Sequence, residues 1–174
     1  MRRQIAAMVG AAALAAAPVA FSADPVRHLD AILRALAPID GPVEADTPPP
    51  SIDLAVVFAL NSASLEPSAI RQLDELGGAL RSPALAGFRF EIGGHTDATG
   101  GAARNRALSL ARAAAVKDYL VGRHGIDPAR LDVAGWGAEW PSDPVNPAAA
   151  INRRVEIVTL GPTAVPSRPV PVRW

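Results

Sequence analysis

The residues best suited to binding chemistry are two opposite charges, Asp97 and Arg112, on either side of a helix start. The apolar pattern predicts a long helix over residues 104–123. At about 100° per residue, Arg112 lies about 40° from Leu108, inside the apolar arc that faces the sheet. A guanidinium does not lose its proton, so an arginine in this position needs an anionic partner.

Asp97 lies in the polar turn that leads into this helix, and two interpretations are open. In the first, Asp97 and Arg112 form a structural ion pair and bind nothing. In the second, both charges line a shallow cleft, where Arg112 takes a carboxylate through a two-pronged hydrogen bond and Asp97 takes an ammonium. The second interpretation predicts a zwitterionic ligand, with further N–H donors from the Gly-rich turn and the helix N-terminus.

Four further residues belong to the candidate site. Asn105 falls in the same apolar arc of the helix, and Thr96 belongs to the polar turn. Strand alternation places Arg153 on the inward face of the last strand, although an arginine that snorkels at a sheet edge is an equally simple interpretation. Asn61 follows the first strand and could supply an amide at the rim or serve only as a turn residue.

The sequence offers little support for catalysis or for a metal. The chain has no cysteine, and its three histidines (His28, His95 and His124) are far apart in the sequence. No G-x-S-x-G and no P-loop is present. With 17 basic and 17 acidic residues, the formal charge is zero, which argues against nucleic acid as a partner. We expect no enzyme, metal or cofactor.

The elements that position these residues alternate between strands and helices. Period-two alternation predicts strands, and apolar stripes at helical spacing predict helices. The predicted strands are 51–60, 88–92, 131–136 and 153–160, and the helices are 67–80 and 104–123. The order βαβαββ indicates a two-layer α/β sandwich, with a mixed four-stranded sheet and two main helices on one face.

The sequence divides into five segments. Residues 1–23 have the pattern of a secretory signal peptide, with an uncleaved anchor helix as the alternative. Residues 24–37 predict a short amphipathic helix, 38–50 a Pro-rich linker, 51–161 the folded domain and 162–174 a Pro-rich disordered tail. The mature protein is expected in the periplasm. The short helix could dock another envelope protein, fold back on the domain or pair with a second copy in a homodimer.

Five motifs in the domain resemble the OmpA-like C-terminal domain family. They are FALNSASL (58–65), GHTDATG (94–100), NRALSLARAAAVKDYL (105–120), GWGAEWP (135–141) and NRRVEI (152–157). The resemblance runs from about residue 52 to residue 160, which is nearly the whole folded block.

The resemblance implies non-covalent binding of the peptidoglycan stem peptide through meso-diaminopimelate. Asp97, Arg112 and Asn105 match family site positions, and Arg153 matches with Arg154 as the alternative. Ala59 stands where the family usually has a polar residue, so one contact is missing. The family also implies association with the outer membrane, but without cysteine this chain is not a lipoprotein. The alternative function is a periplasmic protein-interaction module with a structural Asp97–Arg112 pair.

Overall fold

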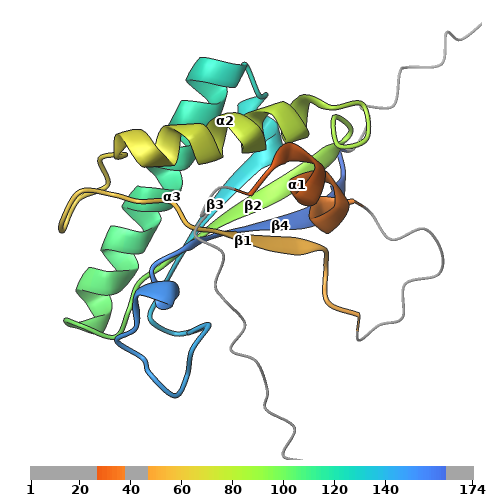
Figure 1. Ribbon diagram of the computed structural model, residues 1–174. Helices are drawn as coiled ribbons and strands as arrows, with labels where there is room; N and C mark the ends of the chain where they lie inside the picture. Colours follow the sequence, from red (N-terminus) through yellow and green to blue (C-terminus); the bar gives the residue numbers. More distant parts are fainter. Residues whose placement is uncertain (1–26, 38–46, 164–174) are drawn as a thin grey trace, which may run out of the picture.

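The computed structural model describes residues 27–37 and 47–163 of the chain. Its sheet has the strand order β1-β4-β2-β3 (Figure 1). The strands are β1 (Ser51–Leu54), β2 (Phe88–His95), β3 (Leu131–Gly137) and β4 (Val155–Pro162). β4 pairs antiparallel with β1 and β2, whereas β2 and β3 run parallel. The predicted mixed four-stranded sheet is confirmed.

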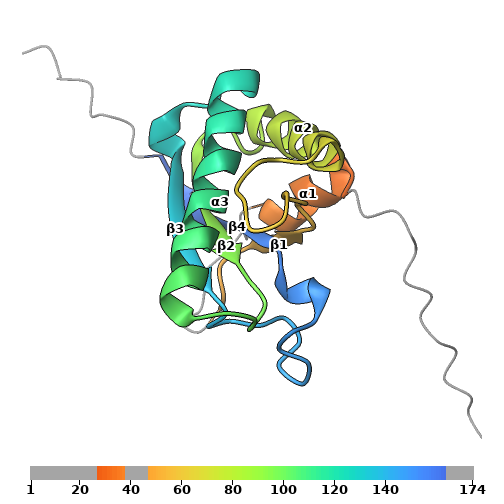
Figure 2. The ribbon, with the colours of Figure 1, turned by 90° about the vertical axis from the view of Figure 1, so that its left-hand side faces the viewer.

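Three helices pack against one face of this sheet: α1 (Leu29–Leu36), α2 (Pro67–Arg81) and α3 (Ala102–His124). Figure 2 shows α3 over β2 and β3, with α1 and α2 beside it. α2 begins at a proline, which is well suited to the first helical turn because its missing N–H would have no partner there. α3 ends at Gly125, whose φ of 64° is the left-handed conformation that favours glycine.

A single apolar core fills the space between the sheet and the helices. Its large, fully buried side chains include Ile32, Leu54, Leu73, Phe90, Leu120 and Ile157. Each of the three helices contributes to this core, so the helical layer contains one helix more than the two main helices predicted from the sequence.

The third helix is α1, which folds back on the domain. Its residues Ile32 and Leu36 are fully buried. The hydroxyl of Thr159 donates to the carbonyl oxygen of Leu36 at 3.0 Å, and the side-chain amide of Gln72 exchanges two hydrogen bonds with the backbone of Arg27. The domain itself therefore covers the apolar face of α1. Of the three alternatives for this helix, folding back on the domain is the one that the structure shows.

β1 is shorter than the predicted strand over 51–60 and ends at Leu54. The following loop folds into a small hairpin, in which Phe58 forms an antiparallel bridge with Leu65. Asn61 lies between them with a φ of 53°, the left-handed region that asparagine tolerates better than most residues. The alternating pattern of residues 55–60 therefore belongs to a small hairpin loop rather than to the sheet.

β2 is longer than predicted, because it continues past residue 92 to His95. Glycines make this possible. A Cβ at Gly94 would overlap a carbonyl oxygen of α3, and a Cβ at Gly135 would lie 2.6 Å from the Cβ of Leu110. The backbone of α3 thus rests directly on the backbones of β2 and β3, which fixes the position of the helix.

Arg130 closes the opposite end of the sheet. It directly precedes β3, and its guanidinium donates to the carbonyl oxygens of Phe88, Leu80 and Leu85 at 2.8–3.1 Å. It also lies over the ring of Phe90, 5.7 Å from the ring centroid, which is within the range of a cation–π contact. These contacts attach β3 to the end of α2 and the start of β2.

The expected signal peptide at 1–23 lies outside the described residues. So do most of the expected linker, 38–50, and most of the expected tail, 162–174. Pro162 itself ends β4 and pairs with Phe88. Within residues 27–37 and 47–163, no helix is both long enough and apolar enough to cross a membrane.

Candidate ligand-binding site

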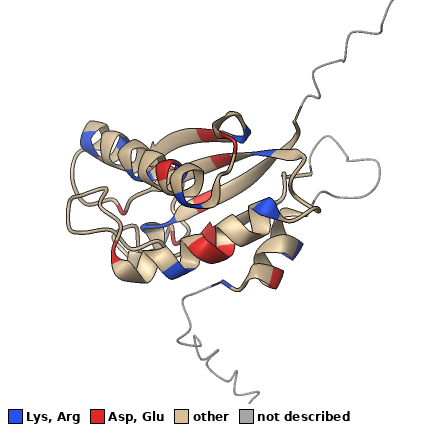
Figure 3. Ribbon diagram, turned by 90° about the horizontal axis from the view of Figure 1, so that it is seen from above, with Lys and Arg blue, Asp and Glu red and all other residues tan. Residues whose placement is uncertain are grey.

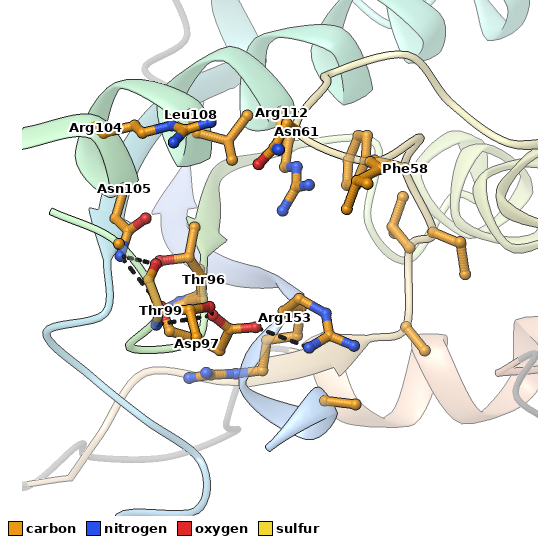
Figure 4. Close-up of a pocket in the computed structure, with 18 residues that line it drawn as sticks. Phe58, Asn61, Thr96, Asp97, Thr99, Arg104, Asn105, Leu108, Arg112 and Arg153 are labelled. Atoms are coloured by element: carbon orange, nitrogen blue, oxygen red, sulfur yellow. Dashed lines mark hydrogen bonds and ion pairs between the residues drawn. The ribbon is translucent and has the colours of Figure 1, made fainter. Parts of the chain in front are cut away.

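A pocket of about 760 Å³ opens at the end of the sheet where β2 leads into α3 (Figure 4). Its walls are the β1–α2 loop, the β2–α3 turn, the first half of α3 and the segment around the 3₁₀ turn Ala150–Asn152. The structure brings all six predicted site residues to this pocket: Asn61, Thr96, Asp97, Asn105, Arg112 and Arg153.

Arg112 enters the pocket from α3 and is buried, with 9% of its surface exposed. This burial confirms the prediction made from helix periodicity. Its Nε donates to the carbonyl oxygen of Ser62 at 3.0 Å, and its guanidinium lies 5.0 Å from the ring centroid of Phe58. Figure 4 shows its terminal nitrogens directed toward the centre of the pocket. Burial, followed by the nearby charge of Arg153, lowers the pKa of Arg112, which still remains a cation at neutral pH.

Asp97 does not pair with Arg112, which corrects one of the two sequence interpretations. Its Oδ2 accepts from Nη1 of Arg153 at 2.8 Å, and its Oδ1 accepts from the backbone N–H and the hydroxyl of Thr99. Burial opposes ionisation of Asp97, but the hydrogen bonds from Thr99 and Arg153 outweigh it and lower the pKa. Asp97 is therefore an anion at neutral pH, on the wall opposite Arg112.

Arg153 reaches the pocket by a different route from the one predicted. It precedes β4 and follows the 3₁₀ turn Ala150–Asn152, so strand alternation does not set its direction. Its side chain is about half exposed, and its guanidinium meets Asp97 at the pocket mouth. Arg154, the alternative from the family resemblance, also lines the pocket.

Asn105 holds the turn that carries Asp97. It is buried, and its Nδ2 donates to the carbonyl oxygens of Asp97 and Thr99 at 3.2 and 3.1 Å. These contacts make it a positioning residue for the β2–α3 turn. Thr96 is also buried, and its hydroxyl has no hydrogen-bond partner among the described residues. A buried hydroxyl without a partner is costly, so a ligand group would stabilise it.

Several pocket residues were not predicted from the sequence, and two of them, Phe58 and Thr99, contact predicted site residues. Phe58 was assigned to a strand, and only the hairpin loop brings it against Arg112. Thr99 could have been found, because a hydroxyl two residues after an aspartate commonly closes a local side-chain turn. Asn61 has the left-handed φ of a turn residue and also lines the pocket, so its amide as a ligand contact stays a prediction.

The pocket carries a positive charge. Its charged lining residues are Arg104, Arg112, Arg153, Arg154 and Asp97. α3 contributes two of these four arginines, Arg104 and Arg112, and Figure 3 shows the basic residues along this helix. An anionic group is therefore the favoured ligand, with Asp97 able to hold one cation beside it. No group of His, Asp and Glu in the described part of the chain could hold a metal.

The fold and this pocket define an α/β sandwich with a charged cleft at one end of its sheet. The family model for the OmpA family matches residues 57–157. The chain belongs to the OmpA family.

The relatives support this assignment. Outer membrane protein A of Yersinia pseudotuberculosis is 35% identical over 153 residues, covering 78% of this chain and 42% of the relative. The chain thus spans less than half of that protein. The peptidoglycan-associated lipoprotein of Burkholderia pseudomallei is 29% identical, with a TM-score of 0.50 over 60% of this chain and 87% of that chain. The cell wall anchor of the T6SS from Pseudomonas aeruginosa is 27% identical, with a TM-score of 0.51 over 64% and 80%.

Proposed function

We propose that this domain binds peptidoglycan non-covalently through the diaminopimelate of the stem peptide, and so links the cell envelope to the wall from the periplasm. The observation that carries the proposal is the state of Arg112. It is buried and charged, yet among the described residues it donates only one hydrogen bond and directs its other nitrogens into the pocket. Such a group needs an anionic partner, and a ligand carboxylate supplies it.

Diaminopimelate fits because one of its ends carries a carboxylate and an ammonium on the same carbon. Arg112 binds the carboxylate, and Asp97 accepts hydrogen bonds from the ammonium. The ammonium shares Asp97 with Arg153, whose half-exposed side chain has room to move. Thr96 offers its buried hydroxyl to the same end of the ligand. Two related structures whose names refer to peptidoglycan or to the cell wall support peptidoglycan as the target.

The role assigned here is binding without catalysis. Asp97 is held by three hydrogen bonds, from Thr99 and Arg153, and is ionised, which suits a ligand contact. His95, two residues away, points its Nε2 to Glu156 at 3.3 Å rather than to Asp97.

The test is titration of the protein with a tripeptide that ends in meso-diaminopimelate and, in parallel, with one that ends in lysine. Lysine keeps the ammonium but lacks the second carboxylate. We expect wild type to prefer the diaminopimelate peptide by about 30-fold, the value of one charge-assisted contact of about 2 kcal/mol. Arg112→Gln should abolish this preference, because the carboxylate then has no guanidinium to bind.

Arg71→Gln is the matched control, since Arg71 is exposed on α2 outside the pocket. It should leave both affinities unchanged. Sedimentation with purified peptidoglycan should follow the same order, with wild type and Arg71→Gln retained and Arg112→Gln lost. Equal affinity of wild type for the two tripeptides would contradict the proposal.

A further inference from the structure

The segment between β3 and β4 presents a tryptophan to solvent beside the pocket. Trp140 is 65% exposed. Among the described residues, five of the seven large apolar side chains that are exposed lie on this segment or on the β1–α2 loop. These five are Val57, Leu60, Trp140, Val145 and Ile151. Figure 2 faces this end of the molecule and shows both loops.

The exposure of Trp140 is fixed by the structure of its loop. Asn152 is fully buried, and its Nδ2 donates to the carbonyl oxygens of Asn146 and Pro147 at 3.1 and 3.0 Å. Its Oδ1 accepts from the backbone N–H of Asp143 at 2.8 Å. Prolines at 141, 144 and 147 further restrict the backbone. The loop is therefore organised without burying Trp140, and presenting this ring to a partner costs little conformational entropy.

Arg154 connects Trp140 to the pocket. It lines the pocket, and its Nη1 donates to the carbonyl oxygen of Trp140 at 3.1 Å. Its Nε donates to Oδ1 of Asp53 at 2.9 Å, and the hydroxyl of Ser142 donates to Oδ2 of the same carboxylate at 3.3 Å. Asp53 remains about half exposed, so lone pairs of its carboxylate are open to further donors.

We infer that Trp140, Asp53 and Ser142 form a second contact area, which binds a sugar ring of the glycan strand to which the stem peptide is attached. A pyranose ring has an apolar face of C–H groups and a rim of hydroxyls. The indole matches the face, and the Asp53 carboxylate accepts from the rim. The Asp53 carboxylate and the Ser142 hydroxyl near this ring favour a sugar, because the core of a protein–protein interface is depleted of charged residues. The inference rests on the proposed function, because the stem peptide in the pocket places the strand nearby.

The test compares two probes, the free diaminopimelate tripeptide and the same tripeptide carrying its N-acetylglucosamine–N-acetylmuramic acid disaccharide. Calorimetric titration of wild type should give about fivefold higher affinity for the disaccharide form, the size of one exposed aromatic contact. Trp140→Ala should remove this gain and leave the affinity for the free tripeptide unchanged. Trp140→Phe should retain about half of the gain in free energy, since it keeps a smaller ring.

Leu160→Ala is the matched control, because Leu160 is an exposed apolar residue on β4 outside the pocket lining. It should change neither affinity. Equal affinity of wild type for both probes would overturn the inference while the proposed function stood. Equal weakening of both probes by Trp140→Ala would also overturn it, by showing that the ring only supports the pocket. Failure of the free tripeptide to bind wild type would instead contradict the proposed function.

Discussion

Two arginines of this domain, Arg112 and Arg130, have similar surroundings but differ in how many hydrogen bonds they donate to the protein. Each lies over a phenylalanine ring, Phe58 for Arg112 and Phe90 for Arg130. Burial is the first cause of a lowered pKa in both. Yet Arg130, the less buried of the two, donates three hydrogen bonds to carbonyl oxygens, whereas Arg112 donates one within the described residues.

The difference shows how a structural arginine can be told from a binding arginine. Arg130 donates its hydrogen bonds to backbone carbonyl oxygens at the end of the sheet, so few of its N–H groups remain for a ligand. Arg112 keeps most of its donors directed into a pocket with an excess of positive charge. A desolvated cation with unused donors is costly unless a ligand completes it. Burial alone would not have distinguished the two.

The largest effect is expected for Arg130, the structural arginine. Arg130→Ala removes the donors for the carbonyl oxygens of Leu80, Leu85 and Phe88, and should lower the free energy of unfolding by about 3 kcal/mol. Urea denaturation measures this loss. The affinity of the folded protein for the diaminopimelate tripeptide should not change. A variant as stable as wild type would show that these contacts are dispensable.

The second prediction tests whether the planar guanidinium of Arg112, and not only its positive charge, is needed for binding. Arg112→Lys keeps the positive charge but loses the planar fork that binds a carboxylate with two hydrogen bonds. Affinity for the diaminopimelate tripeptide should fall about tenfold, or about 1.4 kcal/mol, with a smaller change in the free energy of unfolding. Calorimetry and urea denaturation measure the two effects. Undiminished affinity would mean that Arg112 acts only as a point charge.

The third prediction uses the lowered pKa of Asp97. Because its folded pKa lies below the unfolded value of 3.8, ionised Asp97 stabilises the fold fully above that value, and this contribution is lost as the pH falls through the folded pKa. Asp97 also has to be ionised to bind the ligand ammonium. Affinity for the tripeptide should stay nearly constant from about pH 7 to about pH 5 and decline only in more acidic solution. Titrations across this range check it. Loss of affinity near neutral pH would point to a histidine instead.

The smallest effect is expected at the exposed partner of Asp97. Arg153→Ala should change the free energy of unfolding by less than about 1 kcal/mol, since half-exposed ion pairs contribute little. It should also raise the pKa of Asp97 toward its usual value, because hydrogen bonding and charge from Arg153 both lower it. NMR titration of the Asp97 carboxyl group reports this shift. An unchanged pKa would assign the lowering to Thr99 alone.

Periodicity in the sequence was sufficient for the layers and for the direction of Arg112. The alternation of apolar residues that predicts β4 and the apolar stripe that predicts α3 both reflect burial. Each can therefore be recognised from the local sequence. Residues 55–60 alternate in the same way but pair with the hairpin loop after them. Local pattern does not reveal which partner a strand-like segment will choose.

The pairing of the charges could not be predicted for a related reason. Asp97 and Arg153 are 56 residues apart, and they meet only because the Ala150–Asn152 turn directs Arg153 back toward the β2–α3 turn. The helix wheel placed Arg112 correctly but gave no distance to either charge. Helix and strand positions and the family resemblance both pointed to these residues, whereas the structure was needed to assign Asn105 to holding the turn.

The glycine contacts beneath α3 limit how this pocket can change. Where Gly94 and Gly135 meet α3, the sheet backbone lies directly against the helix with no side-chain layer between them. Any larger residue at either position would shift the whole helix, moving Asn105 and Arg112 together. Divergence in ligand preference among related chains should therefore concentrate in the two loops facing the helix, whose length and composition can vary while the guanidinium stays in place.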